Sequence, residues 1–409
     1  MKAFFKVTNL EHVLEYTTSF SVVGTEFVTL TEANQRILAE DIFSDVDLPD
    51  FTRSTMDGFA VRAASTFGAS ETNPAYLTVK GSVAMGEIPA FSIAPGEAAR
   101  IPTGGMLPEG ADSVVMIEHT GEIDDNTIEV YRIVAPGQHV IEAGEDFSKG
   151  QTILSAGQKI RPQETGLLAA FGIDMVKVYK KPVVGIISTG DEVVPVDQIP
   201  GPGQIRDTNT YTLSSLIAEA GGIPVTYGIV RDDYNALFEK CSEALAQCNM
   251  VLISGGSSVG TRDFTIEAIS TLPEAEVLVH GISISPGKPT ILAKIGNKSF
   301  WGLPGHVVSA MVVFTVVVKP FVEHIGGLSQ QYRGKAKLPA LLSRNVSSAQ
   351  GRIDFIRVRL TEKDGALWAE PVLGKSGLIN TMVKADGLIE IDINTEGLDK
   401  GAEVQVILF

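Results

Sequence analysis

The sequence predicts an α/β protein of several domains with a mostly parallel sheet at its centre. Three observations predict this class. Strand-like and helix-like segments alternate between residues 182 and 326, short alternating apolar segments fill residues 75–133, and strand-sized segments return after Gly327. We therefore expect an N-terminal linker and helical region over residues 1–180 with a β-rich insert at about 50–140, an α/β domain over 181–327, and a small C-terminal β-domain over 328–409.

In the N-terminal region, residues 9–20 and 31–39 are predicted to form short helices, and residues 49–58 a loop. A further helix is expected to begin at Pro162 and to be closed by Gly172, the residue type that most often follows a helix.

The central domain is predicted from its alternating elements. They are expected at 183–188 (strand), 208–220 (helix), 225–230 (strand), 234–248 (helix), 250–254 (strand), near Asp263 (helix), 290–295 (strand) and 307–318 (helix). Such an alternation predicts a parallel sheet with helices on both faces. Ligands then bind beyond the carboxyl ends of the strands, so the chemistry is expected there.

The charge balance excludes nucleic acid as an expected partner. The chain has 33 basic and 49 acidic residues, a formal net charge of −16, and no cluster of Lys and Arg. An anionic ligand would therefore have to be held by local backbone N–H groups, helix N-termini or a metal ion.

We expect a cytoplasmic protein with no membrane partner. The N-terminus has no uninterrupted apolar signal core, and the longest apolar run, residues 307–318, is too short to span a bilayer, so a buried helix is predicted there. Cys241 and Cys248 lie seven residues apart on one helix face, too far for a disulfide, and are expected to be buried as small hydrophobic residues.

Two polar loops follow predicted strands of the central domain. Thr189-Gly190-Asp191-Glu192 places two carboxylates at the end of strand 183–188, and a solvated acidic turn is the alternative. Gly255 to Gly260 follows strand 250–254 and precedes a helix; its glycines would let backbone N–H groups surround an anion, although a plain tight turn has the same pattern.

Gly256-x-Ser258-x-Gly260 also matches the nucleophile elbow of α/β-hydrolases. A catalytic triad would then need a downstream acid and a histidine, and three histidines are available: His280, His306 and His324. A serine hydrolase therefore remains an alternative at this stage.

Two bends should lie at one edge of the sheet, because residues 285–289 and 302–305 flank the segments TILAKI and SFW. Lys288 would pair with a phosphate there, or be a solvated lysine in a turn. His306 would be a ligand or base, or a capping or packing residue at the start of the apolar helix.

Carboxylates that lie in loops or at element ends indicate a magnesium site. They are Asp57, Asp146, Glu192, Asp232 and Asp263. Mg²⁺ bridging carboxylates and phosphate oxygens uses such a set. The His and Cys spacing of a zinc site is absent from the sequence.

Taken together, these motifs resemble the molybdopterin molybdenumtransferase family, the group of MoeA and the gephyrin E-domain, over nearly the whole chain. The matching stretches are STMDGFAVR, RIPTGGMLPEGADSVVMIEHT, AGEDFSKGQTIL, IISTGDEVV, GQIRDTNTYTL, GIVRDD, SGGSSVGTRDF, PGKPT, GLPG and KSGLINTMVKADGLI. An ordered set of this length is far more specific than any one motif.

The resemblance implies a molybdopterin-binding fold for the central domain and a barrel-like C-terminal domain. It implies adenylylated molybdopterin and molybdate as substrates, AMP as a product, Mg²⁺ as cofactor, and a homodimer whose subunits share their active sites. It also implies the upstream adenylyltransferase as a partner.

Carried over by motif, the expected catalytic residues are Asp57, Thr103, Asp146, Glu192, Asp232, Asp263 and Lys288. The expected substrate-binding residues are Thr189, Gly190, Gly255, Gly256, Ser258, Gly260, Pro286, Gly287, Pro304, Gly305 and Ser376. The expected Mg²⁺ ligands are Glu192, Asp232 and Asp263.

Three stretches depart from the usual family pattern. Ser285 stands where a lysine usually precedes PGKP, His306-Val307 stands where Asn-Pro is usual, and Val140-Ile141-Glu142 lies where an arginine is usual. Lost positive charges should weaken anion binding unless other cations compensate, the candidates being Lys288, Arg262 and Arg206. The choice between molybdate and tungstate stays open, as does a catalytically weakened paralogue that binds pterin or partner proteins as a scaffold.

Overall fold

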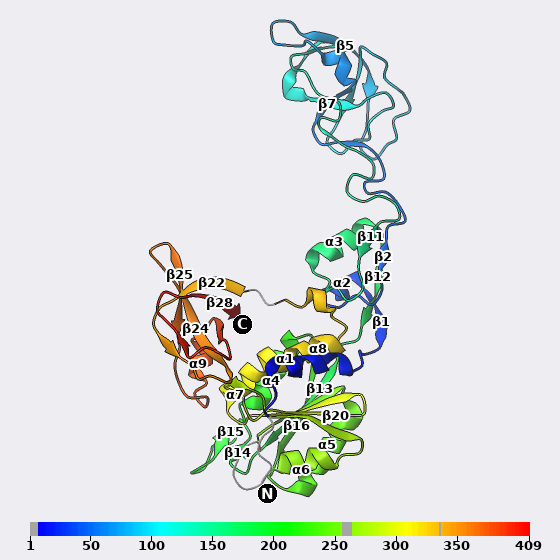
Figure 1. Cartoon of the computed structure of the whole chain (residues 1–409). Coiled ribbons are helices and arrows are strands. Elements are labelled where there is room, and N and C mark those ends of the chain that lie inside the picture. Colours follow the sequence, from blue (N-terminus) through cyan, green and yellow to red (C-terminus); the bar gives the residue numbers. More distant parts are fainter. Residues whose placement is uncertain (1–6, 256–263, 335–336) are drawn as a thin grey trace. The chain divides into compact units, whose positions relative to one another are not determined.

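The computed structural model describes residues 7–255, 264–334 and 337–409 (Figure 1). The chain forms two compact units. One contains the residues up to Glu40, Ala156–Thr165 and Asp174–Phe409, and the smaller one contains Asp41–Ser155 and Gly166–Ile173.

The smaller unit is built on a six-stranded sheet with the order β7-β4-β6-β5-β9-β8. Its strands are β4 (Gly58–Val61), β5 (Ala75–Ser82), β6 (Glu97–Ile101), β7 (Ser113–Met116), β8 (Thr120–Asp124) and β9 (Thr127–Val130). Short pairs are formed by β2 (Ile42–Phe43) with β11 (Thr152–Leu154) and by β3 (Arg53–Ser54) with β10 (Val140–Ile141). Phe59, Leu77 and Ile128 form its core. The predicted β-rich insert is confirmed.

The N-terminal part of the larger unit contains α1 (Leu10–Glu15), η1 (Tyr16–Ser19), β1 (Thr25–Thr29) and α2 (Leu30–Ala33). The helix predicted at 9–20 is confirmed as α1 and η1, but the helix predicted at 31–39 is wrong beyond Ala33. There the chain is extended, because Ile37 and Leu38 form β-bridges with Lys159 and Val178. β1 pairs antiparallel with β12 (Met175–Tyr179).

The helix predicted after Arg161 is confirmed as α3 (Pro162–Ala170). Gly172 follows it with φ of +71°, a left-handed conformation that closes helices at low cost when the residue is glycine.

The central sheet has the strand order β16-β13-β17-β21-β20-β18. The strands are β13 (Val183–Thr189), β16 (Ile223–Val230), β17 (Met250–Ser254), β18 (Ala275–His280), β20 (Ile291–Ile295) and β21 (Lys298–Leu303). The first four in this order are parallel, whereas β20 and β18 run antiparallel to their neighbours. The sheet is therefore mostly parallel with an antiparallel edge, and β18 was not among the predicted strands.

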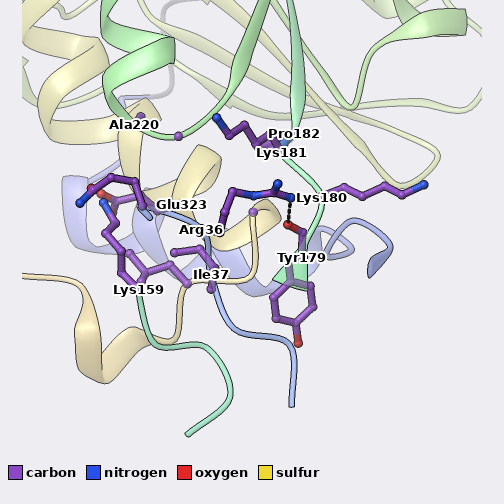
Figure 2. A pocket seen from close by; sticks show the side chains of 13 residues that line it. Arg36, Ile37, Lys159, Tyr179, Lys180, Lys181, Pro182, Ala220 and Glu323 are labelled. Atoms are coloured by element: carbon purple, nitrogen blue, oxygen red, sulfur yellow. Dashed lines mark hydrogen bonds between the residues drawn. The ribbon is translucent and has the colours of Figure 1, made fainter. Parts of the chain in front are cut away.

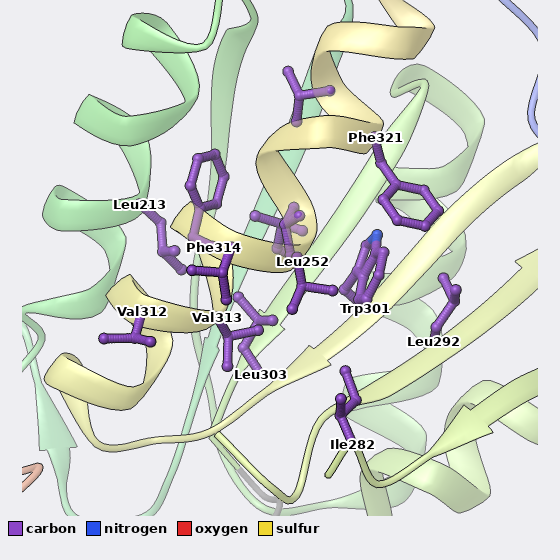
Figure 3. Packing of buried hydrophobic residues seen from close by; sticks show 14 of the residues in the cluster. Leu213, Leu252, Ile282, Leu292, Trp301, Leu303, Val312, Val313, Phe314 and Phe321 are labelled. Carbon is purple, nitrogen blue, oxygen red and sulfur yellow. The ribbon is translucent and has the colours of Figure 1, made fainter. Parts of the chain in front are cut away.

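Helices cover both faces of this sheet, as predicted. They are α4 (Asn209–Glu219), α5 (Tyr234–Gln247), α6 (Phe264–Thr271), α7 (Val307–Val313), the π-helical η4 (Phe314–Val318) and α8 (Lys319–Ile325). α4, α7, η4 and α8 pack with Leu252 and Trp301 on one face (Figure 3), and α1 belongs to the same cluster. α5 and α6 pack with Val251, Ile253 and Phe300 on the other. Alternate residues of one strand point to opposite faces of the sheet. Because helices cover both faces, the residues on each face are apolar.

The apolar run is confirmed as a buried helix. The continuous helical stretch Val307–Ile325 is 19 residues long and passes the length and hydropathy test for a membrane span, but 72% of its most apolar window is buried. Figure 3 shows Phe321 beside Trp301, whose ring centroids lie 4.9 Å apart at an interplanar angle of 82°. Burial on this scale is typical of a core helix.

The C-terminal part of the larger unit contains a closed five-stranded barrel, which confirms the barrel-like domain. Its strands are β22 (Lys337–Leu342), β24 (Ile353–Lys363), β25 (Ala366–Pro371), β26 (Gly387–Ile391) and β28 (Glu403–Leu408). Pairing of β24 with β26 closes the ring. The short strand β19 (Ile284–Ser285) pairs with the first residues of β24, so the bend after Ser285 lies beside the barrel.

Candidate functional site

The carboxyl ends of the parallel strands carry the first cluster of site residues. Thr189 is the last residue of β13, Asp232 lies two residues beyond β16, and Gly255 follows β17 directly. The Thr189 hydroxyl donates a hydrogen bond of 2.8 Å to Oδ1 of Asp232. The backbone N–H of Asp232 donates one of 3.3 Å to Oδ1 of Asp191. The structure therefore brings two loops from separate sequence motifs together.

Gly255 has no room for a side chain. Its φ is +116°, and an added Cβ would lie 2.1 Å from the carbonyl oxygen of Thr189. Its N–H donates a hydrogen bond of 3.3 Å to the carbonyl of Leu303 at the end of β21. Only glycine permits this backbone approach, which holds three strand ends together.

Asn209, which the sequence analysis did not single out, links this cluster to the GLPG bend. Its amide nitrogen donates to Oγ of Ser254 at 2.5 Å and to the carbonyl of Gly305 at 2.8 Å, and the residue is buried. The available signal was its place in the stretch GQIRDTNTYTL.

The carboxylates of this cluster are the oxygen ligands that Mg²⁺ prefers, and Mg²⁺ is often held by only one or two carboxylates together with substrate phosphates. Glu192 and Asp232 fit that requirement by their chemistry and their position at strand ends. Over residues 7–255, 264–334 and 337–409, no group of three His, Cys, Asp or Glu side chains is gathered as a complete metal site. Four expected site residues lie outside the described residues: Gly256, Ser258, Gly260 and Asp263.

A second cluster surrounds an open cleft of about 620 Å³ that contains the two predicted bends. We call it the PGKP cleft. Its lining residues are Val7, Ile282, Ser283, Ile284, Ser285, Pro286, Gly287, Lys288, Pro289, Pro304, His306, Ser309, Ala349, Gln350, Gly351, Arg352 and Ser376. Residues of both predicted bends line this one cleft, and the C-terminal region adds Arg352 and Ser376 to them.

Ser376 is held in the PGKP cleft by two contacts with the start of α7. Its Oγ lies 3.0 Å from Nδ1 of His306, and its carbonyl accepts a hydrogen bond of 3.1 Å from the N–H of Val308 in the first turn of α7. Gly374 lies two residues before Ser376, and its carbonyl accepts a hydrogen bond of 2.8 Å from the side chain of Arg357. Burial lowers the pKa of Arg357. The barrel and the α/β fold together position this serine.

Arg352 brings a cation to the PGKP cleft from the start of β24. Its Nε lies 3.1 Å from Oδ1 of Asp354, and Oδ2 of Asp354 accepts a hydrogen bond of 2.7 Å from Ser348. This ion pair fixes the Arg352 side chain, which also lines the cleft. Sequence reasoning did not single out this residue.

In the smaller unit, Asp57 and Thr103 contact each other directly. The backbone N–H of Thr103 donates a hydrogen bond of 2.7 Å to Oδ1 of Asp57. This bond is the main cause of a lowered pKa of Asp57, which favours its carboxylate form. Asp146 lines a separate open cleft of about 620 Å³ with Arg53 and Glu145.

A further pocket, drawn in Figure 2, is too small to be a substrate site. Its volume is about 30 Å³, room for roughly one water molecule. Arg36 in its wall donates a hydrogen bond of 2.9 Å to the carbonyl of Tyr179 and forms an ion pair with Glu26. Lys159 and Lys181 also line it, and it contains none of the predicted site residues.

The two cysteines and His324 serve packing and structural hydrogen bonds. Both cysteines are free and buried, and burial raises the pKa of Cys241 to about 12, so it is a packing residue as predicted. His324 has its Nε2 3.0 Å from the carbonyl of Phe20 and its Nδ1 2.9 Å from Arg333, so neither ring nitrogen is available to activate a serine.

Comparison with known proteins assigns the family. Residues 8–172 match the MoeA N-terminal region (domains I and II), residues 185–324 match the family described as "probable molybdopterin binding domain", and residues 339–409 match the MoeA C-terminal region (domain IV). The loop with the hydrolase-like pattern falls inside the second match, so the hydrolase alternative has no support.

The molybdopterin molybdenumtransferases of Bacillus subtilis and Haemophilus influenzae are each 35% identical to the chain; the alignments cover 94% and 93% of this chain and 90% and 93% of those proteins. Two solved structures of Pyrococcus horikoshii molybdopterin biosynthesis MoeA proteins are similar. One has a TM-score of 0.80 and 41% identity over 98% of this chain and 99% of the other, and the second has 0.85 and 33% over 99% and 100%. The chain belongs to the MoeA family of molybdopterin molybdenumtransferases.

Proposed function

We propose that this protein inserts molybdenum from molybdate into adenylylated molybdopterin and releases AMP, the last step of molybdenum cofactor synthesis. Similarity along nearly the whole chain to relatives named molybdopterin molybdenumtransferase carries this proposal. The two clusters of polar groups at one edge of the central sheet are consistent with two substrates, one that contains a phosphoanhydride and one that is an oxyanion.

The strand-end cluster would bind the phosphoanhydride. Glu192, Asp232 and Asp263 would hold Mg²⁺, which supplies neutralisation of charge developing on phosphate oxygens. Thr189 orients Asp232 through its hydrogen bond. Backbone N–H groups of the glycine-rich stretch would contact the phosphates, the residues proposed being Gly190, Gly255, Gly256, Ser258 and Gly260.

The PGKP cleft would bind molybdate. Lys288 and Arg352 supply positive charge, and Ser376 supplies a hydroxyl donor. The bends that form its walls contain the other residues proposed to contact substrate, Pro286, Gly287, Pro304 and Gly305. In a protein of net charge −16, this local arrangement would provide the attraction that the whole molecule does not.

We further propose a cytoplasmic homodimer in which subunits share active sites, with Asp57, Thr103 and Asp146 serving the same reaction. The upstream adenylyltransferase would supply the substrate. Mixing Asp57→Ala and Asp263→Ala proteins under conditions that allow subunit exchange should restore part of the activity. Failure of exchanged mixtures to exceed either variant alone would refute the shared site for this pair.

The deciding experiment measures AMP release from adenylylated molybdopterin by purified protein with Mg²⁺ and either molybdate or tungstate. We expect release that depends on the oxyanion and is lost in excess EDTA. A protein that binds the substrate without releasing AMP would instead be a scaffold paralogue. Full activity in excess EDTA would exclude the Mg²⁺ proposal while leaving the transferase proposal intact.

A further inference from the structure

The side chain of His306 lies at the PGKP cleft without a capping role of its own. His306 is the residue before α7, yet its side chain makes no capping hydrogen bond to that helix. The ring is exposed and lines the cleft, and its Nδ1 lies 3.0 Å from Oγ of Ser376. The chain therefore places a titratable group in the wall of the cleft.

The hydrogen bond between His306 and Ser376 couples the direction of the serine hydroxyl to the protonation of the imidazole. A serine hydroxyl has one hydrogen to donate, whereas an imidazole nitrogen either donates or accepts. When Nδ1 carries no proton, the Ser376 hydroxyl donates to it, and the serine oxygen then presents only lone pairs to the cleft. When Nδ1 carries a proton, it donates to Oγ, and the serine hydrogen is available to an anion in the cleft.

The charges around His306 favour the binding of an anion when its Nδ1 carries a proton. Lys288 faces the cleft from the bend after β19, and Arg352 faces it from the start of β24. The first turn of α7 contributes only uncharged side chains, Val307, Val308 and Ser309. No carboxylate is among the described residues that line the cleft, and the carboxylate of Asp354, which pairs with the lining residue Arg352, also accepts a hydrogen bond from Ser348.

We propose that His306 is a positioning residue that makes oxyanion binding depend on pH, because protonation of its ring frees the Ser376 hydroxyl to bind the oxyanion and adds a third positive charge. The inference rests on the proposed role of the PGKP cleft as the molybdate site. An asparagine at this position would not have this effect, since its amide donates a hydrogen bond without changing its charge.

The proposal predicts in which direction the affinity for molybdate changes with pH. Histidine is the side chain that ordinarily changes charge between about pH 5 and 8. Molybdate should therefore bind more tightly as the pH falls from about 8.5 to about 6, by about tenfold, since a charge-assisted hydrogen bond is roughly twice as strong as a neutral one. Reciprocally, bound molybdate should move the ring titration of His306 to higher pH.

The test measures molybdate binding directly by isothermal titration calorimetry across this pH range, with no turnover required. His306→Asn should bind with an affinity that hardly changes with pH. Ser376→Ala should bind molybdate more weakly than the wild type, and its affinity should change less with pH because the hydroxyl is gone. His12→Asn is the matched control, because His12 is an exposed residue of α1 that does not line the cleft, and it should retain the wild-type slope.

Proton NMR of the histidine rings supplies a second readout. The chain has six histidines, so the His306 signal is the one missing from the His306→Asn spectrum. Its titration midpoint should rise with saturating molybdate. A pH dependence that survives in folded His306→Asn, or an unmoved midpoint, would overturn the inference. Absence of molybdate binding at every pH would instead overturn the proposed function of the cleft.

Discussion

The hydroxyl of Thr189 and the carboxylate of Asp232 are joined by a hydrogen bond of 2.8 Å that links the ends of β13 and β16. These residues are 43 positions apart in the sequence. Thr189 is almost fully buried, at 3% exposure, so its side chain has one position to occupy and fixes one oxygen of Asp232. In the proposed site, the other oxygen of Asp232 would contact the ligand at the strand ends.

Thr189→Val should reduce molybdate-dependent AMP release by about tenfold or more, because a hydrogen bond to a charged group is worth about 1.5–3 kcal/mol. Valine keeps the shape of threonine without its hydroxyl. Thr189→Ser keeps the hydroxyl and should retain most of the activity. Thermal melting of both variants separates this effect from unfolding. Full activity in a folded valine variant would show that the bond does not position Asp232.

Gly287→Ala should destabilise the protein and distort the PGKP cleft. Its φ is +120°, and an added Cβ would lie 2.3 Å from Cγ2 of Val313, which is fully buried in α7. Overpacking of this kind costs about 1–3 kcal/mol, and the melting temperature should fall accordingly. Gly166→Ala in α3 is the control, since nothing lies within 4 Å of its added Cβ. The control should melt at the same or a higher temperature. Equal melting of the two variants would contradict the close approach at Gly287.

Ser285→Lys should strengthen molybdate binding, because it adds a cation to a cleft already lined by Lys288 and Arg352. A charge about 5 Å from a dianion gains several kcal/mol of gross attraction at an effective dielectric near 20, before desolvation is subtracted. Ser285→Met, which adds length without charge, is the matched control. Calorimetric titration with molybdate measures both. An affinity equal to or below that of the methionine variant would count against the electrostatic explanation.

His324 should make the folded state less stable as the pH falls. Burial lowers the pKa of its ring, the hydrogen bond to the Phe20 carbonyl opposes this, and the charge of Arg333 lowers the pKa further. The unfolded chain therefore binds the proton more tightly than the folded one. The stabilisation is fully present above the ordinary histidine pKa of about 6.5 and is lost as the pH falls through the lower folded-state pKa.

Urea unfolding at a series of pH values between about 7.5 and 5 measures this loss as a falling midpoint. His324→Gln is the informative variant, because its amide can donate to Phe20 and accept from Arg333 without titrating. Its midpoint should fall less steeply with pH. Parallel profiles for the two proteins would assign the pH dependence to other groups.

Much of the secondary structure followed from local patterns. Strands such as β13 and β17 are continuous apolar runs because the sheet buries both of their faces, and β5 alternates because only one of its faces is buried. Gly172 marked the end of α3 because glycine readily adopts the left-handed conformation that closes a helix. The extended segment after Ala33 could not be predicted, since its partners Lys159 and Val178 lie more than a hundred residues away and override a helical pattern.

The sequence by itself determined which loops contain the candidate chemistry: Thr189 and Asp232 at strand ends, Lys288 in a bend, and Ser376 in a family motif. Only the tertiary structure decided which of these side chains meet. The bonds between Thr189 and Asp232 and between His306 and Ser376 span 43 and 70 positions. Such contacts depend on strand order and on the docking of the barrel beside β19, neither of which has a local signature in the chain.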